Sequence, residues 1–165
     1  MFSACQVFFF VPTHIASRNT GHEFLGRSAG AGSLSVWTHF LKSFEYLPDY
    51  TQTGYADQAA KVGVGLEAWE LFPYMERYNT TVVIPSGKSV GAYGGWFAGG
   101  GHGVLASLYG LGSDQPLTMQ VVTADGRFVT ASPEVNEDLY YAIRGGGASE
   151  FFFHTTKYTF YCMNT

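Results

Sequence analysis

The chain has 165 residues, a net charge of −4 and only 13% charged residues. This length is enough for one domain with a core, and 46% apolar content with 17% aromatic residues argues against intrinsic disorder. The acidic balance and the lack of a basic run argue against a nucleic-acid partner.

The apolar run at residues 7–11 is too short to span a membrane, so no membrane partner is expected. It has the composition of a signal-peptide core, but no positive charge precedes it, and Pro12 and His14 follow closely. The sequence therefore predicts no secretion signal, and the localisation stays unassigned.

Residues 18–28, Arg-Asn-Thr-Gly-His-Glu-Phe-Leu-Gly-Arg-Ser, are the first informative segment. Gly21 and Gly26 interrupt it, which predicts a shaped loop. Successive amides of such a loop can form an anion-binding nest. His22 is the one side chain of this segment that can act as a nucleophile near neutral pH.

Side chains of the same segment would add donors for phosphate, namely the guanidinium groups of Arg18 and Arg27 and the hydroxyls of Thr20 and Ser28. These features together predict a phosphate-bearing cofactor held against His22. The alternative is an ordinary turn-rich connection with a chance histidine.

Regular structure is predicted next along the chain. Alternating side chains at residues 33–41 predict a strand, and residues 59–64 form a second candidate. Gly65 opens a predicted helix over residues 66–78, which Pro73 is expected to break or kink.

A second loop is predicted at residues 94–103, which contain six glycines. Glycine lets the backbone approach a flat or anionic ligand closely. A short helix over residues 104–109 would add partial positive charge at its start. The alternative is a flexible surface loop.

The last predicted elements are a hairpin and a helix. Strand-like residues 117–124 and 127–131 flank Asp125-Gly126, a strong hairpin signal. A short helix near residues 137–143 leads into the glycines at 145–147.

Four segments in this order, residues 18–28, 94–103, 109–114 and 138–147, resemble the berberine bridge enzyme-like flavoproteins. These belong to the vanillyl alcohol oxidase/PCMH family of FAD-linked oxidases. The resemblance covers about residues 18–147. It implies an α+β fold: a PCMH-type FAD-binding domain of mixed and antiparallel sheets with surrounding helices, here incomplete.

The resemblance also implies site residues. The histidine that matches His22 is joined to the flavin C8-methyl group in the family, and no cysteine between residues 6 and 161 offers a second link. No metal is expected, and no residue is assigned as the catalytic base. The residues expected to bind FAD are Arg18, Asn19, Thr20, Gly21, His22, Glu23, Phe24, Gly26, Arg27, Ser28, Gly94, Gly95, Gly99, Gly100, Gly101, Gly103, Asp114, Gly145 and Gly146.

The resemblance divides the chain into a leader unlike the family (1–17), a partial FAD-binding domain (18–147) and a divergent tail (148–165). The substrate domain is expected to be absent, and so is the family's strand after Gly147. Two functions follow. The first is an FAD-dependent oxidoreductase with a small-molecule substrate, dioxygen as electron acceptor and secretion left open. The alternative is a truncated, non-catalytic remnant.

Overall fold

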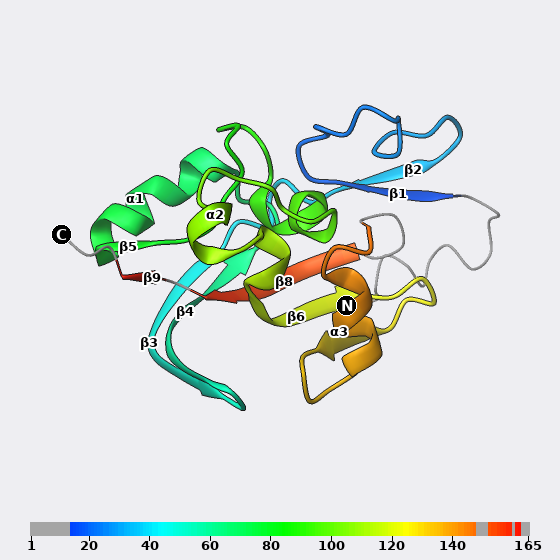
Figure 1. Cartoon of the computed structure of the whole chain (residues 1–165). Helices are drawn as coiled ribbons and strands as arrows, with labels where there is room; N and C mark the ends of the chain where they lie inside the picture. Colours follow the sequence, from blue (N-terminus) through cyan, green and yellow to red (C-terminus); the bar gives the residue numbers. More distant parts are fainter. Residues whose placement is uncertain (1–13, 148–151, 160, 163–165) are drawn as a thin grey trace.

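The structure is a computed structural model that describes residues 14–147, 152–159 and 161–162. An antiparallel sheet of five strands forms its centre, in the order β3-β4-β8-β6-β7 (Figure 1). These strands are β3 (Phe44–Gln52), β4 (Tyr55–Gly63), β6 (Pro116–Val122), β7 (Phe128–Ala131) and β8 (Phe152–Thr159).

Two small sheets accompany the central one. Strands β1 (Ile15–Arg18) and β2 (Leu34–Trp37) run parallel to each other and lie apart from the five-stranded sheet in Figure 1. Strand β5 (Thr80–Thr81) pairs with β9 (Tyr161–Cys162) in antiparallel fashion.

The helices are short, and they confirm the predicted α+β class. The α-helices are α1 (Ala68–Tyr78), α2 (Ala106–Tyr109) and α3 (Glu137–Ile143). A π-type turn, η2 (Ala92–Trp96), and a 3-10 turn, η3 (Gly112–Asp114), lie in the glycine-rich part of the chain.

One buried apolar cluster joins the sheet to the helices. Strand β6 contributes Met119 and Val121, whose alternation follows the period of two in a strand. Helix α1 contributes Leu71 and Met75, which are four residues apart and therefore share one face. Phe97, which follows η2, is fully buried in the same cluster, so the glycine-rich segment is fixed to the core.

Several predicted elements are confirmed. The hairpin at Asp125-Gly126 joins β6 to β7, and the Thr123 amide donates to the Arg127 carbonyl at 2.9 Å. Gly126 has φ +80°, the left-handed conformation that such a turn requires. The predicted helix at residues 137–143 coincides with α3.

Three expectations need correction. Helix α1 continues through Pro73 without a break. The strand predicted at residues 33–41 is only β2, because the chain turns where the Leu41 amide donates to the Thr38 carbonyl at 2.9 Å. The strand expected to be missing after Gly147 is present: β8 lies at the centre of the sheet and pairs with both β4 and β6.

Strand β3 is not predicted from the sequence. It contains Pro48 and Asp49, which are poor strand residues. The register with β4 shifts between Leu47 and Tyr50, which accommodates both. Because β3 is an edge strand, the missing amide of Pro48 costs less there than it would inside the sheet.

The Glu70 carboxylate stabilises the first turn of α1, so the stability of the protein depends on the protonation of this group. The Glu70 carboxylate accepts from the Glu67 amide at 3.0 Å and from Lys42 Nζ at 2.6 and 2.7 Å. Partial burial raises the pKa of Glu70, but the hydrogen bonds from Lys42 and the Glu67 amide outweigh it, so the net pKa lies below its ordinary value. The stabilisation is therefore present above the unfolded-state pKa and lost as pH falls through the folded-state pKa.

We expect Glu70→Gln to lower the free energy of unfolding by about 1 kcal/mol at about pH 7. The difference should vanish in acid, where the wild-type carboxyl is protonated. Urea denaturation at both pH values measures this. Glu76→Gln, at an exposed position of the same helix, is the control and should leave stability unchanged; an equal loss in both variants would contradict the role of Glu70.

Candidate cofactor site

The first predicted loop connects the parallel strands β1 and β2, and its first residues are anchored in the body of the protein. Asn19 Nδ2 donates to the Val64 carbonyl at 2.5 Å, and Trp37 Nε1 donates to the Asn19 carbonyl at 2.7 Å. The Gly91 amide donates to Thr20 Oγ1 at 3.3 Å. A side chain at Gly91 would collide with Asn19, since its Cβ would lie 1.9 Å from Asn19 Nδ2.

The tip of this loop closes on itself. The Glu23 carboxylate accepts from the amides of Leu25 and Arg27, each at 2.7 Å, and from Arg27 Nε at 3.2 Å. Desolvation raises the pKa of Glu23, but these hydrogen bonds outweigh it and hold the pKa below its ordinary value. Phe24 is 94% exposed, so the tip projects into solvent and Glu23 has a local structural role.

Gly21 and Gly26 have positive φ values, as the predicted loop shape requires. Gly26 has no atom within 4 Å of the position of a Cβ, which agrees with an exposed tip. At the far end of the segment, the Ser28 carbonyl accepts from Ser35 Oγ at 3.5 Å.

His22 lies between the anchored part and the tip, and it reaches a second segment. Its Nε2 is hydrogen-bonded to Ser89 Oγ at 2.9 Å. Ser89 belongs to residues 86–91, which pack on the first turn of α1. There the amides of Ala68 and Trp69 donate to the carbonyls of Val90 and Lys88, each at 3.0 Å.

The second predicted loop contains regular helical structure. Gly94 and Gly95 lie within η2, and the Gly99 amide donates to the Gly95 carbonyl at 3.0 Å. Gly103 packs against the backbone of Ile84, whose carbonyl oxygen would lie 2.5 Å from a Cβ. Helix α2, which follows, is one turn of four residues, so the field of its N-terminus is weaker than the sequence predicts.

Gly100 and Gly101 meet the third segment through backbone hydrogen bonds. The Gly112 amide donates to the Gly101 carbonyl at 2.8 Å, and the Ser113 amide donates to the Gly100 carbonyl at 3.1 Å. Gly101 has φ +74°, and a Cβ there would lie 2.6 Å from Gly112 Cα. No larger residue fits this crossing without a backbone shift.

Arg144 holds the fourth segment against the third. Its Nε donates to the Ser113 carbonyl at 2.7 Å and its Nη2 to the Asp114 carbonyl at 3.3 Å. Its guanidinium carbon also lies over the ring of Tyr140, 4.9 Å from the ring centroid. Burial raises the pKa of Tyr140 while Arg144 opposes the rise.

The remaining predicted residues of these segments serve the same junction. The Asp114 carboxylate accepts from the Leu111 amide at 2.8 Å. Gly145 faces Ser113, whose Oγ would lie 3.8 Å from a Cβ, and Gly146 packs on the Ala142 carbonyl. The junction closes where the Gly147 amide donates to the Ala98 carbonyl at 2.9 Å.

Two buried polar atoms at the start of the first loop fit a polar ligand. Arg18 Nε and Asn19 Oδ1 have no hydrogen-bond partner among the described residues. Buried polar atoms normally find a partner. The phosphates and the flavin ring carry acceptors for Arg18 Nε, and the N–H of the flavin ring is a donor for Asn19 Oδ1, so these residues fit FAD.

The sequence does not single out Ser89, Gly91, Gly112 and Arg144 as site residues. Gly112 and Arg144 lie inside the segments 109–114 and 138–147, and Ser89 and Gly91 shortly precede residues 94–103, so their place in or near a predicted segment is the one signal that could have found them. The structure brings His22 against the segment that contains Ser89. It brings Gly100, Gly101, Asp114 and Gly145 to the place where residues 94–103, 109–114 and 138–147 meet. It leaves Phe24, Gly26 and Arg27 at the exposed tip, where binding of FAD stays a prediction.

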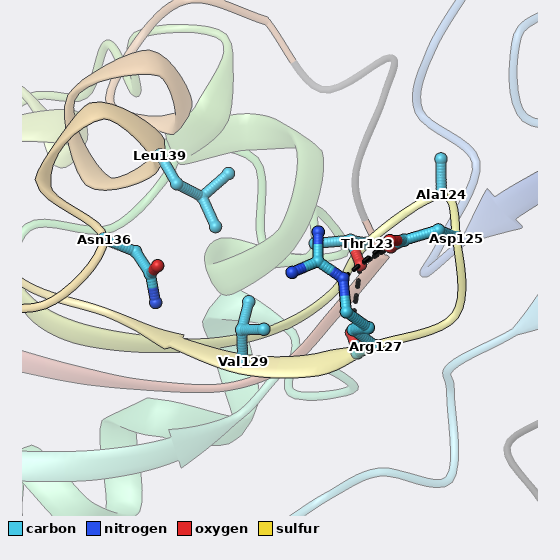
Figure 2. Close-up of a pocket in the computed structure, with 7 residues that line it drawn as sticks. All are labelled: Thr123, Ala124, Asp125, Arg127, Val129, Asn136 and Leu139. Atoms are coloured by element: carbon cyan, nitrogen blue, oxygen red, sulfur yellow. Dashed lines mark hydrogen bonds and ion pairs between the residues drawn. The ribbon is translucent and has the colours of Figure 1, made fainter.

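A separate hollow lies at the β6–β7 hairpin and α3 (Figure 2). It is lined by Thr123, Ala124, Asp125, Arg127, Val129, Asn136 and Leu139. Hydrogen bonds from Thr123 and Arg127 lower the pKa of Asp125, so its charge is already matched locally. None of these residues is a predicted site residue.

Among residues 14–147 and the two described strands that follow, no cluster of three or more histidine, cysteine, aspartate or glutamate side chains could hold a metal ion. The helices within this part of the chain are all too short or too polar to cross a membrane.

Known proteins share this fold and these segments. A family model described as an FAD binding domain matches residues 12–132. The VAO-type flavoprotein oxidase VAO615 of Thermothelomyces thermophilus is 43% identical over 137 residues, which cover 83% of this chain and 24% of that protein. The chain thus spans about a quarter of the length of this relative.

Solved structures agree. The VAO-type flavoprotein MtVAO615 from Myceliophthora thermophila C1 matches with a TM-score of 0.93 and 37% identity, covering 96% of this chain and 29% of that one. Wild-type BBE-like 1 of Physcomitrella patens matches with a TM-score of 0.78 and 26% identity, covering 96% and 33%.

The fold and the junctions of glycine-rich segments therefore define a PCMH-type FAD-binding domain. The chain belongs to the FAD binding domain family, and its relatives are VAO-type and FAD-linked oxidoreductases. The resemblance to berberine bridge enzyme-like flavoproteins is confirmed.

Proposed function

We propose that this chain is the FAD-binding part of an FAD-dependent oxidoreductase and that the flavin is attached covalently through His22. The observation that carries this is the position of His22. It lies on a loop that Asn19 anchors to Val64. Arg18 and Asn19, four and three residues before His22, each have a buried polar atom without a partner among the described residues. Such a loop can present an imidazole at a fixed place beside a bound ring.

The chain's own residues would bind and orient the cofactor. Arg18 would donate to it, Asn19 would accept from it, and the backbone amides of the glycine-rich segments would face its phosphates. Bound FAD supplies the acceptor for a hydride from the substrate. We further propose a small-molecule substrate and dioxygen as the final electron acceptor.

The test is a flavin assay on the full chain. After purification and denaturation, the peptide that contains His22 should carry flavin absorbance and the added mass of FAD. His22→Ala should abolish this signal. His102→Ala, at an exposed histidine of the second segment, should retain it.

Flavin that is released completely on denaturation would overturn covalent attachment while leaving FAD binding intact. Protein that takes up no flavin would overturn the proposed function. Attached flavin without reduction by any alcohol, alkaloid or carbohydrate would favour the alternative, a non-catalytic chain that only binds FAD.

A further inference from the structure

The contact between His22 and Ser89 has a chemical consequence for flavin attachment. The two side chains lie 67 residues apart in sequence, yet Nε2 and Oγ are 2.9 Å apart. We propose that Ser89 positions His22 for flavin attachment by holding its Nε2 atom and so fixing the orientation of the imidazole ring. This rests on the proposed function, in which His22 carries the flavin.

Ser89 is held in place although it is exposed. The carbonyls on both sides of it, those of Lys88 and Val90, accept hydrogen bonds from the first turn of α1. The Val90 amide also donates to the Gly87 carbonyl at 3.0 Å. Because the backbone is fixed before and after Ser89, its hydroxyl can act as a fixed reference for the imidazole.

The loop that bears His22 is fixed against the same segment. The Gly91 amide, two residues after Ser89, donates to Thr20 Oγ1, two residues before His22. Gly91 also packs directly on Asn19. The His22–Ser89 hydrogen bond therefore spans two backbones that already touch, and forming it costs little further ordering.

The hydrogen bond fixes the orientation of the imidazole ring. A serine hydroxyl can both donate and accept, so Ser89 Oγ holds Nε2 in either tautomer of the neutral imidazole. A ring that is held at one nitrogen rotates less, and its reactive nitrogen spends more time in the geometry that attachment needs.

The attachment step balances with dioxygen as oxidant. The step would join one imidazole nitrogen of His22 to the flavin C8-methyl carbon, with loss of one hydrogen from that methyl group and one from the imidazole. The two protons and two electrons pass to dioxygen and give hydrogen peroxide. The product is FAD joined to His22 with two hydrogens fewer than the separate reactants.

The rate of covalent attachment after FAD is added to flavin-free full chain tests this role. Flavin fluorescence of acid-quenched, denatured samples follows the reaction. Ser89→Ala should slow attachment by about tenfold, the order expected for loss of one hydrogen bond in a transition state. Ser89→Thr keeps the hydroxyl and should restore the rate, and Ser86→Ala, an exposed serine of the same segment, should match wild type.

A second measurement separates positioning of His22 from direct flavin contact. In a His22→Ala background, adding Ser89→Ala should leave the Kd for non-covalent FAD unchanged, because the partner through which Ser89 acts is gone. Weaker binding in that background, or equal attachment rates for wild type and Ser89→Ala, would overturn the proposal. Wild-type protein that binds FAD but never attaches it would instead overturn the proposed role of His22.

Discussion

Gly101→Ala is expected to lower the free energy of unfolding by about 2–5 kcal/mol, the sum of backbone strain and overpacking. Gly101 has φ +74°, which disfavours any side chain. The new Cβ would also lie 2.6 Å from Gly112 Cα, and backbone cannot move aside as a flexible side chain can. Because this crossing joins two glycine-rich segments, FAD binding should fall with stability.

Gly32→Ala separates the two causes. Gly32 has φ +73°, nearly the same conformation, but no atom lies within 4 Å of its Cβ position. It should cost only the conformational part, about 1–2 kcal/mol. Thermal and urea unfolding of both variants measure the difference, and equal losses would show that the contact with Gly112 does not matter.

Arg144→Ala is expected to lower the free energy of unfolding by about 2–3 kcal/mol, because hydrogen bonds from a charged donor are lost. The carbonyl of Ser113, a residue that is 6% exposed, would lose its donor. FAD affinity should fall as well, since η3 and the glycines after α3 would no longer be held together.

Arg127→Ala is the matched control, because its side chain is 71% exposed and pairs only with a neighbouring aspartate among the described residues. It should change stability by less than about 0.5 kcal/mol. Arg144→Lys should not restore stability, since an ammonium cannot reproduce the two-point contact of a guanidinium. Full rescue by lysine would mean that charge alone matters.

The sequence was sufficient where structure is local. Glycine-rich segments, the Asp125-Gly126 turn and the helix before Gly145 carry short-range signals, and all three appear in the structure. His22 could be placed on a loop because glycines flank it. Its exposure and its contact with Ser89 depend on a segment 67 residues away and could not be read from the chain.

Strand pairing between residues far apart in sequence explains why strands β8 and β3 were not predicted. Strand β8 consists of residues that favour strands, Phe-Phe-His-Thr-Thr-Lys-Tyr-Thr, but departure from a family pattern hides this signal. Its position between β4 and β6 is fixed by backbone pairing with residues far away in sequence. Pro48 hides β3 in a different way, since only its place at a sheet edge makes it tolerable.

The central position of β8 sets an order of events during synthesis on the ribosome. Hairpins β3–β4 and β6–β7 are local and can form as soon as their residues emerge. They become one sheet only when β8, the last of the five strands to be made, enters between them. We therefore expect nascent chains that stop before residue 152 to expose unpaired strand edges, to bind chaperones and to bind no cofactor.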